Sequence, residues 1–215
     1  IQAWAQDHNC AVVMPSGDNK FYIDNELSGD YYSKFIGEEL VEVTRKMFNL
    51  SNKREDTFIA GLSMGGYGAL VNGLKYNKTF GYIAALSAAV HMDHFINIKE
   101  NAKNEILSRS ELISIFGDLD KLIGSDKDYK YLAKRLKSNK PKIYIACGTE
   151  DHLLEYNRNF RDYLLDLNYD ITYIEGPGGH DWVFWDTYIL KVLQWLPLDK
   201  KVEAISSGNV REKKQ

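Results

Sequence analysis

The stretch GLSMGGYGAL, residues 61–70, places one serine among small residues. Within it, Gly61, Ser63 and Gly65 form the pattern G-x-S-x-G. The apolar run FIAGL before the serine predicts a buried strand, and the small residues over 64–75 predict a helix. A G-x-S-x-G pattern at a strand-to-helix turn is typical of a nucleophile elbow. The pattern therefore favours a nucleophilic Ser63 over a glycine-rich helix start that only packs.

The glycines of this stretch have a steric explanation. Side chains two residues either side of Ser63 would collide as the helix folds back on the strand, so small residues are expected there. The same turn points backbone N–H groups toward the place where an oxyanion would develop. We expect the Met64 N–H to be one of these donors.

Apolar runs elsewhere predict four more strands that alternate with helical segments. The strands are expected at 10–15, 82–88, 142–148 and 170–176, beside the one at 56–63. Helices are expected at 33–49, 64–75, from Leu153 to Leu167, and over 182–196, with Ile36, Leu40, Val43 and Met47 on one face of the first. This alternation predicts an α/β fold, a mostly parallel sheet with helices on both faces.

The chain reads as one domain over residues 1–198 with a polar tail at 199–215. The segment 91–140 is charged and helical in character and contains no clear strand, so we expect a cap-like insertion over the sheet edge. The two cysteines, Cys10 and Cys147, are expected to be buried reduced thiols.

The charge of the chain is nearly balanced, at −3, and no apolar run approaches the length of a membrane span. Nucleic acid and membrane are therefore not expected as partners, and a homo-oligomer stays open. No signal peptide is visible at the N-terminus, and the predicted location is cytoplasmic.

A serine nucleophile needs a base and an acid, which should follow later strands in the order serine, acid, histidine. His180 follows the run ITYIEG, and Asp151 follows KIYIACG. Because the carboxyl ends of parallel strands meet at one edge, these loops can bring Ser63, Asp151 and His180 together. Glu150 stays open as an alternative acid.

The remaining polar and aromatic residues near these loops have simpler interpretations. His152 is expected to point away from Asp151, and Asp181 to cap the last helix. His91 and His94 lack a third well-spaced ligand, so no metal site is predicted. Trp182 is a candidate substrate contact because it lies two residues from His180.

The stretches GLSMGGYGAL, CGTEDHLLEYNRNFRDYL and GPGGHDWVFWDTYI together resemble the esterase D group of α/β-hydrolases, which includes S-formylglutathione hydrolases, tributyrin-type esterases and feruloyl esterases. The resemblance covers about residues 1–198. It implies an α/β-hydrolase fold and cofactor-free hydrolysis of small acyl or aryl esters (acetyl, butyryl or feruloyl type). Ser63, Asp151 and His180 would act through an acyl-enzyme, and Phe21 and Tyr22 would border the substrate.

The sequence departs from the pattern of that group at its N-terminal end. In the group the nucleophile follows the fifth strand, and an apolar strand running into His-Gly supplies the second oxyanion donor. Here Ser63 follows only the second predicted strand, and no His-Gly dipeptide occurs. We therefore expect the N-terminal strands of the fold to be missing from this chain, and the strands at 10–15 and 56–63 not to pair directly.

Two other functional classes stay open at this level. An acyltransferase would use the same three residues and pass the acyl group to an alcohol instead of water. A non-catalytic binding module would keep the fold without the chemistry, although the intact serine, aspartate and histidine argue against it.

Overall fold

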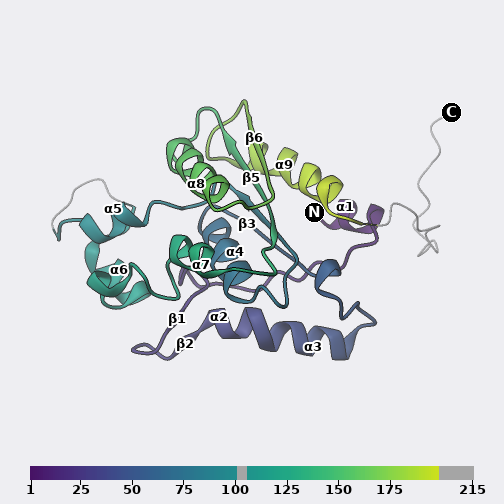
Figure 1. The fold of residues 1–215 in the computed structure, drawn as a ribbon, viewed down its shortest axis with the longest axis horizontal. Helices are drawn as coiled ribbons and strands as arrows, with labels where there is room; N and C mark the ends of the chain where they lie inside the picture. Colours follow the sequence, from purple (N-terminus) through teal and green to yellow (C-terminus); the bar gives the residue numbers. More distant parts are fainter. Residues whose placement is uncertain (101–105, 199–215) are drawn as a thin grey trace.

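The computed structural model describes residues 1–100 and 106–198. Its main sheet contains β3 (Phe58–Leu62), β4 (Tyr82–Leu86), β5 (Lys142–Gly148) and β6 (Ile171–Gly176) in the order β3-β4-β5-β6 (Figure 1). All three neighbouring pairs are parallel. A short antiparallel pair, β1 (Asp24–Asn25) with β2 (Asp30–Tyr31), lies within the N-terminal loop region. The expected parallel α/β architecture is confirmed.

Helices connect and flank these strands. They are α1 (Gln2–Asp7), α2 (Tyr32–Lys34), α3 (Leu40–Met47), α4 (Met64–Lys75), α5 (Met92–Asn97), α6 (Arg109–Phe116), α7 (Tyr129–Arg135), α8 (Leu154–Asp166) and α9 (Trp182–Trp195). A π-helical turn (Phe35–Glu39) joins α2 to α3, and short 3-10 turns cover Arg54–Asp56 and Leu119–Lys121. None of these helices is long and apolar enough to cross a membrane.

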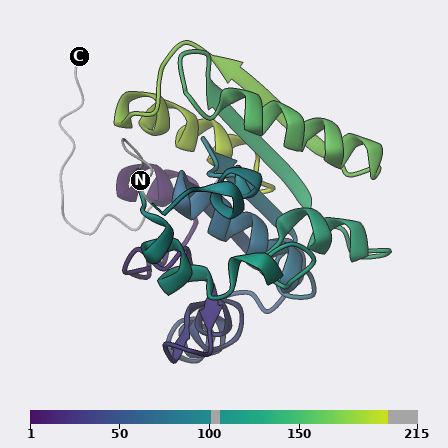
Figure 2. The ribbon, with the colours of Figure 1, turned by 90° about the vertical axis from the view of Figure 1, so that its left-hand side faces the viewer.

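The central strands bury side chains on both faces, because helices cover the sheet from two sides. Ile83 and Ile143 belong to a core cluster shared with α4, α7 and α8. Their neighbours Ala84 and Tyr144 point the other way, into a cluster shared with α9. In Figure 2, α8 and α9 lie on opposite sides of β5 and β6. This two-sided burial explains the continuous apolar runs of the strands.

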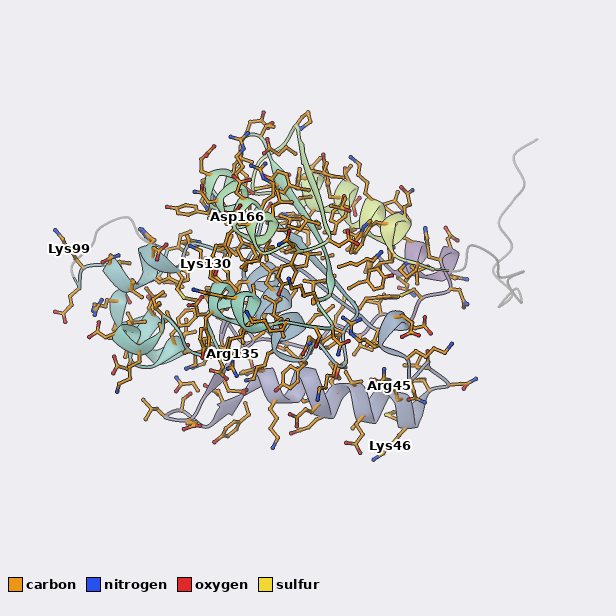
Figure 3. The ribbon with its side chains drawn as sticks, viewed as in Figure 1. Arg45, Lys46, Lys99, Lys130, Arg135 and Asp166 are labelled. Carbon is orange, nitrogen blue, oxygen red and sulfur yellow. The ribbon has the colours of Figure 1, made fainter. Side chains whose placement is uncertain are left out.

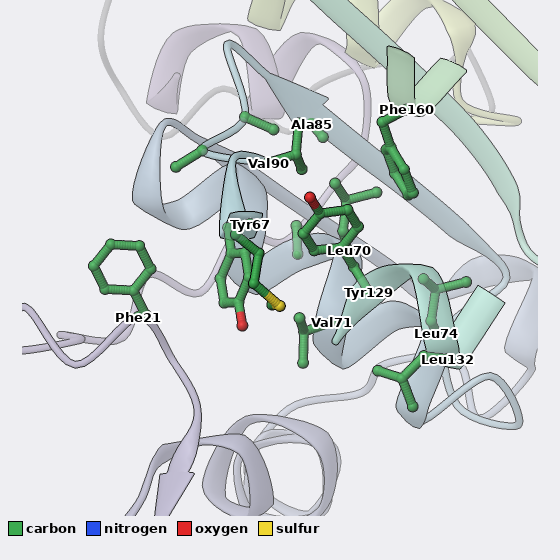
Figure 4. Close-up of a cluster of buried hydrophobic side chains, with 14 of the residues drawn as sticks. Phe21, Tyr67, Leu70, Val71, Leu74, Ala85, Val90, Tyr129, Leu132 and Phe160 are labelled. Carbon is green, nitrogen blue, oxygen red and sulfur yellow. The ribbon is translucent and has the colours of Figure 1, made fainter. Parts of the chain in front are cut away.

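The larger cluster joins distant segments of the chain. Figure 4 shows Phe21 from the N-terminal loop beside Tyr67 of α4, with Leu70 of α4, Tyr129 of α7 and Phe160 of α8 further along. The Phe21 and Tyr67 rings meet edge to face, with centroids 5.5 Å apart. The loop before α2 is thereby fixed against the first turns of α4.

The strand expected at residues 10–15 is absent, and that prediction is wrong. The segment has no strand assignment, and Val12, Val13 and Met14 are exposed, Met14 to 76 %. Among the described residues, β3 has only β4 as a strand neighbour. Without an adjacent strand the segment forms no hydrogen-bonded ladder, and its apolar composition alone does not create one.

The helix expected over 33–49 forms, but its expected apolar face is only partly buried. Ile36 is buried, whereas Val43 and Met47 are exposed. The π-helical turn changes the angular spacing of the residues before α3, so a regular period cannot carry one face through it. Close contact with the core occurs at Gly37, where a Cβ would come within 2.2 Å of the Tyr76 ring.

The segment expected as an insertion contributes α5, α6 and α7, and its residues 101–105 lie outside the described part of the chain. In Figure 1, α5 and α6 lie to one side of the sheet. Leu112 and Phe116 of α6 nevertheless belong to the larger core cluster. The division into a hydrolase domain and a cap-like insertion stays a prediction, as does the polar tail 199–215, which is also outside the described residues.

Charged side chains project from the outer helices. Figure 3 shows Arg45 and Lys46 on α3, Lys130 and Arg135 on α7, and Asp166 on α8. These positions contrast with the mostly apolar central strands β4 and β5.

We predict that the two glycines beside Ser63 respond differently to alanine. A Cβ at Gly61 would lie 2.1 Å from the Gly65 carbonyl oxygen, whereas a Cβ at Gly65 would meet only the Tyr22 ring, at 3.8 Å. Gly61→Ala should lower the free energy of unfolding by about 3 kcal/mol, the upper end of the usual range for an overpacked site, because the overlap is with backbone atoms. Gly65→Ala should change it by no more than about 1 kcal/mol. Urea unfolding of both variants tests this, and equal effects would contradict it.

Candidate active site

Ser63 occupies the turn between β3 and α4 with a strained backbone. Its φ is 52° and its ψ is −119°, a conformation that residues with a side chain rarely adopt. The Ser63 N–H donates to the Leu86 carbonyl at 2.9 Å, and the Ser63 carbonyl accepts from the Ala89 N–H at 3.1 Å. The end of β4 therefore holds the strained serine from both sides of its backbone.

A chain of hydrogen bonds runs from Ser63 across the sheet edge. The Ser63 Oγ lies 2.9 Å from His180 Nε2, in the loop between β6 and α9. His180 Nδ1 lies 3.0 Å from Asp151 Oδ2 and 3.2 Å from Oδ1, in the loop after β5. With the ring proton on Nδ1, the Nε2 lone pair faces the serine hydroxyl, which is the arrangement that general-base activation requires.

Asp151 is a buried anion held by several donors. Burial alone raises the pKa of its carboxyl group, but hydrogen bonds from His180, the Leu153 N–H and Ser87 outweigh this and lower the pKa to about 2. The Leu153 N–H donates to Oδ1 at 2.8 Å. Asp151 is therefore charged at neutral pH and can stabilise a positive charge on His180.

The neighbouring carboxylates have other partners. Glu150 accepts a hydrogen bond from the Gly178 N–H at 2.5 Å, and the Glu150 N–H donates to the Gly178 carbonyl at 3.1 Å. Asp181 accepts from the Val183 and Phe184 N–H groups, so its expected role as the cap of α9 is confirmed. Of the three carboxylates, Asp151 is the one that the structure places against His180.

The residues expected to bind the oxyanion and the substrate occupy different positions around this chain of hydrogen bonds. Met64 begins α4, where the first backbone N–H groups have no partner within the helix. Tyr22 packs against Gly65 and Gly68 of α4, while Phe21 is buried in the core. Both have positive φ, 53° for Phe21 and 59° for Tyr22.

Trp182 is 72 % exposed and meets Trp185 edge to face, with ring centroids 5.3 Å apart. Trp185 in turn packs edge to face on His180, with ring centroids 4.9 Å apart. Trp182 therefore borders the histidine through one intervening ring.

The histidines outside the predicted triad also have defined positions. His152 does not point away from Asp151 as expected, because its Nδ1 lies 3.6 Å from Asp151 Oδ1. His91 and His94 lie at the start of α5, with His91 packed on Phe95 at a centroid distance of 4.4 Å. Among the described residues, the one group of three side chains close enough to share a metal ion is Asp151, His152 and His180.

Sequence reasoning missed Ser87, which follows β4. Ser87 is fully buried with φ of 45°, and its Oγ accepts from Trp185 Nε1 at 3.1 Å. The same hydroxyl hydrogen-bonds Asp151 and contributes to its low pKa. Ser87 is a polar residue at the carboxyl end of a buried strand, and that position was the available signal.

Both thiols of the chain are free, as expected, but their burial differs. Cys147 is buried beside Asp151 at the end of β5, and burial first of all raises its thiol pKa to about 12. Cys10 is only partly buried. Cys147 is thus a neutral packing residue next to the carboxylate.

A parallel α/β sheet with a serine on a strained strand-to-helix turn, facing a histidine and a buried carboxylate, defines an α/β-hydrolase of the serine type. The chain belongs to the esterase family described as "Putative esterase", whose model matches residues 2–196.

Known proteins of similar sequence and structure agree with this assignment. The chain is 47% identical over 192 residues to an acetyl esterase of Caldicellulosiruptor saccharolyticus, covering 88% of this chain and 72% of that protein. A fluorophosphonate-binding serine hydrolase F of Staphylococcus aureus superposes with a TM-score of 0.78 at 32% identity, covering 91% of this chain and 74% of the other. An S-formylglutathione hydrolase of the same organism gives a TM-score of 0.76, with the same identity and coverage.

These relatives establish the type of reaction. The chain is a serine esterase, an enzyme that hydrolyses carboxylic esters. The resemblance to the esterase D group is confirmed, and the acyltransferase and non-catalytic alternatives are not favoured.

We predict that Ser87 positions Asp151, so Ser87→Ala should lower kcat about 10- to 100-fold, the effect of losing one hydrogen bond to a charged group. KM should change little, because the hydroxyl is buried behind the carboxylate. Steady-state kinetics test this, with the exposed Ser138→Ala as a matched control. A purely structural role would instead lower the unfolding midpoint and leave kcat of the folded enzyme unchanged.

Proposed function

We propose that Ser63, His180 and Asp151 are the catalytic residues of this esterase and that it removes small acyl groups, acetyl above all, from alcohols. The observation that carries the assignment of roles is the unbroken chain of contacts from Ser63 Oγ through both His180 ring nitrogens to Asp151. The strained backbone of Ser63 adds to it, since strain of this kind gathers at active sites.

In the proposed mechanism, His180 Nε2 takes the Ser63 hydroxyl proton as Oγ attacks the ester carbonyl carbon. The Asp151 carboxylate keeps the remaining ring proton on Nδ1 and stabilises the imidazolium. The Met64 N–H at the start of α4 donates to the oxyanion. His180 then protonates the leaving alcohol, and water attacks the acyl-enzyme with His180 again as the base.

The proposal of a small acyl group rests on the relative with the highest identity reported above, which is named for acetyl esters. The turn around Ser63 is consistent with it. Gly65 lies two residues after the serine, and Tyr22 packs across Gly65 and Gly68, so an aromatic ring borders this side of the elbow. Phe21 lies in the core behind Tyr22 and would fix the position of that ring, and Trp182 would border the alcohol portion from the histidine side.

We predict a clear difference between neighbouring carboxylates. Asp151→Asn should lower kcat about 10⁴-fold, because an amide cannot hold the required histidine tautomer. Glu150→Gln should lower kcat at most about tenfold, the effect of weakening one hydrogen bond to the loop that carries His180. Ser63→Ala should lose activity entirely and no longer react with a fluorophosphonate probe. Comparable losses for the Asp151 and Glu150 variants would contradict the assignment.

The acyl preference is tested on p-nitrophenyl esters. We expect kcat/KM to be highest for the acetate, lower for the butyrate, and lower still for a feruloyl ester. A feruloyl ester that is hydrolysed faster than the acetate would overturn the proposed substrate class while leaving the triad assignment intact. Added glycerol separates hydrolysis from acyl transfer. Hydrolysis releases the alcohol and leaves glycerol unchanged, whereas acyl transfer also produces acylated glycerol.

The finer expectations about the cellular setting stay predictions. A cytoplasmic location is tested by fractionating cells that express the natural gene. A homo-oligomer is tested by light scattering of the purified enzyme. Neither bears on the roles of the three residues.

A further inference from the structure

A second histidine lies beside the proposed triad. His152 directly follows Asp151, and its side chain is 59% exposed. Its Nδ1 is 3.6 Å from Asp151 Oδ1, and its ring centroid is 4.9 Å from that of His180. Ester hydrolysis as described above gives this histidine no role.

The three side chains have the spacing of a metal site. One ligand atom from each of Asp151, His152 and His180 can be chosen so that all lie within 4.8 Å of one another. His180 Nδ1 and His152 Nδ1 are 3.2 Å and 3.6 Å from Asp151 Oδ1. A tetrahedral Zn²⁺ with bonds of about 2.0–2.1 Å places its ligand atoms about 3.4 Å apart. Small side-chain movements would therefore complete the geometry.

The chemistry of the three donors selects the type of ion. Two imidazole nitrogens and one carboxylate oxygen form a ligand set found in zinc enzymes, with a fourth position for water. Mg²⁺ and Ca²⁺ prefer sites made of oxygen atoms. The buried Asp151 carboxylate supplies negative charge, and exposed His152 provides the side from which an ion can enter.

We propose that Asp151, His152 and His180 form a reversible inhibitory site for Zn²⁺ or a similar borderline divalent cation. The ion occupies the place of the His180 Nδ1 proton, and that proton moves to Nε2. His180 then carries N–H where Ser63 requires a lone pair, so the ring can no longer accept the serine proton. The ion also takes over the Asp151 charge that would stabilise the imidazolium.

This inhibition rests on the proposed roles of His180 and Asp151, but binding of the ion does not. Binding is therefore measured separately, by calorimetric titration of Zn²⁺ into the Ser63→Ala variant, which is inactive for its own reason. We expect one Zn²⁺ per chain at this site, and an affinity at least about tenfold lower when His152→Asn is added, since even residues supporting a metal ligand cost this much. The His94→Asn change, at an exposed histidine on α5, is the matched control and should leave the affinity unchanged.

Inhibition is measured as initial rates on p-nitrophenyl acetate in a metal-free, non-chelating buffer, each variant being compared with its own rate without metal. Zn²⁺ should inhibit the natural sequence and His94→Asn alike, EDTA should restore the rate, and Mg²⁺ should have no effect. His152→Asn should need at least about tenfold more Zn²⁺ for half inhibition. Equal inhibition with and without His152, or equal Zn²⁺ affinity in the two Ser63→Ala backgrounds, would overturn the proposal. Zn²⁺ binding that requires His152 but does not inhibit would instead count against the roles assigned to His180 and Asp151.

Discussion

The arrangement depends on the close backbone contact where α4 folds back on β3. Gly61 lies so near the Gly65 carbonyl that a methyl group at Gly61 could not fit. Ser63, between them, takes a positive φ and is held by hydrogen bonds with the backbone of Leu86 and Ala89, at and after the end of β4. The same contacts fix the start of α4 against the sheet. Serine position and helix packing are thus set by one constraint, so neither can change alone.

The parallel register extends this constraint across the sheet. Leu62 pairs with Leu86 at the ends of β3 and β4, and Gly148 pairs with Gly176 at the ends of β5 and β6. Residues just beyond these strand ends therefore meet in space although they lie far apart in the sequence. A Cβ on Gly148 would lie 2.0 Å from the Gly178 carbonyl oxygen, so the acid and histidine loops touch through backbone atoms. Backbone proximity, more than any side chain, brings Asp151 and His180 together.

How far the sequence predicts this structure depends on how local each feature is. The elbow at Ser63 and the four central strands follow from apolar runs and adjacent small residues, and both were predictable. The absence of a strand at 10–15 was not predictable, because strand pairing depends on a neighbouring strand that composition does not reveal. The contact of Ser87 with Asp151 was not predictable either, since it joins residues 64 positions apart by way of the sheet. Loop order indicated the acid region, and the resemblance to the esterase D group implied Asp151. Without that resemblance, only geometry distinguishes the two adjacent carboxylates.

The segment Glu150–Asp151–His152 shows why the local sequence alone could not make that choice. Its three side chains leave one bend in different directions: Glu150 to the Gly178 N–H, Asp151 into the buried site, and His152 to the exposed side of the His180 ring. Each direction follows from the backbone path after β5, which the Gly148 and Gly178 contact enforces. Glu150 holds the loop before His180 through its hydrogen bonds with Gly178, and the adjacent Asp151 holds the His180 ring itself. The two residues act independently. A change at Glu150 loosens the loop, whereas a change at Asp151 alters the charge and tautomer of the His180 ring. The effects of the two substitutions on catalysis therefore differ in mechanism as well as in size.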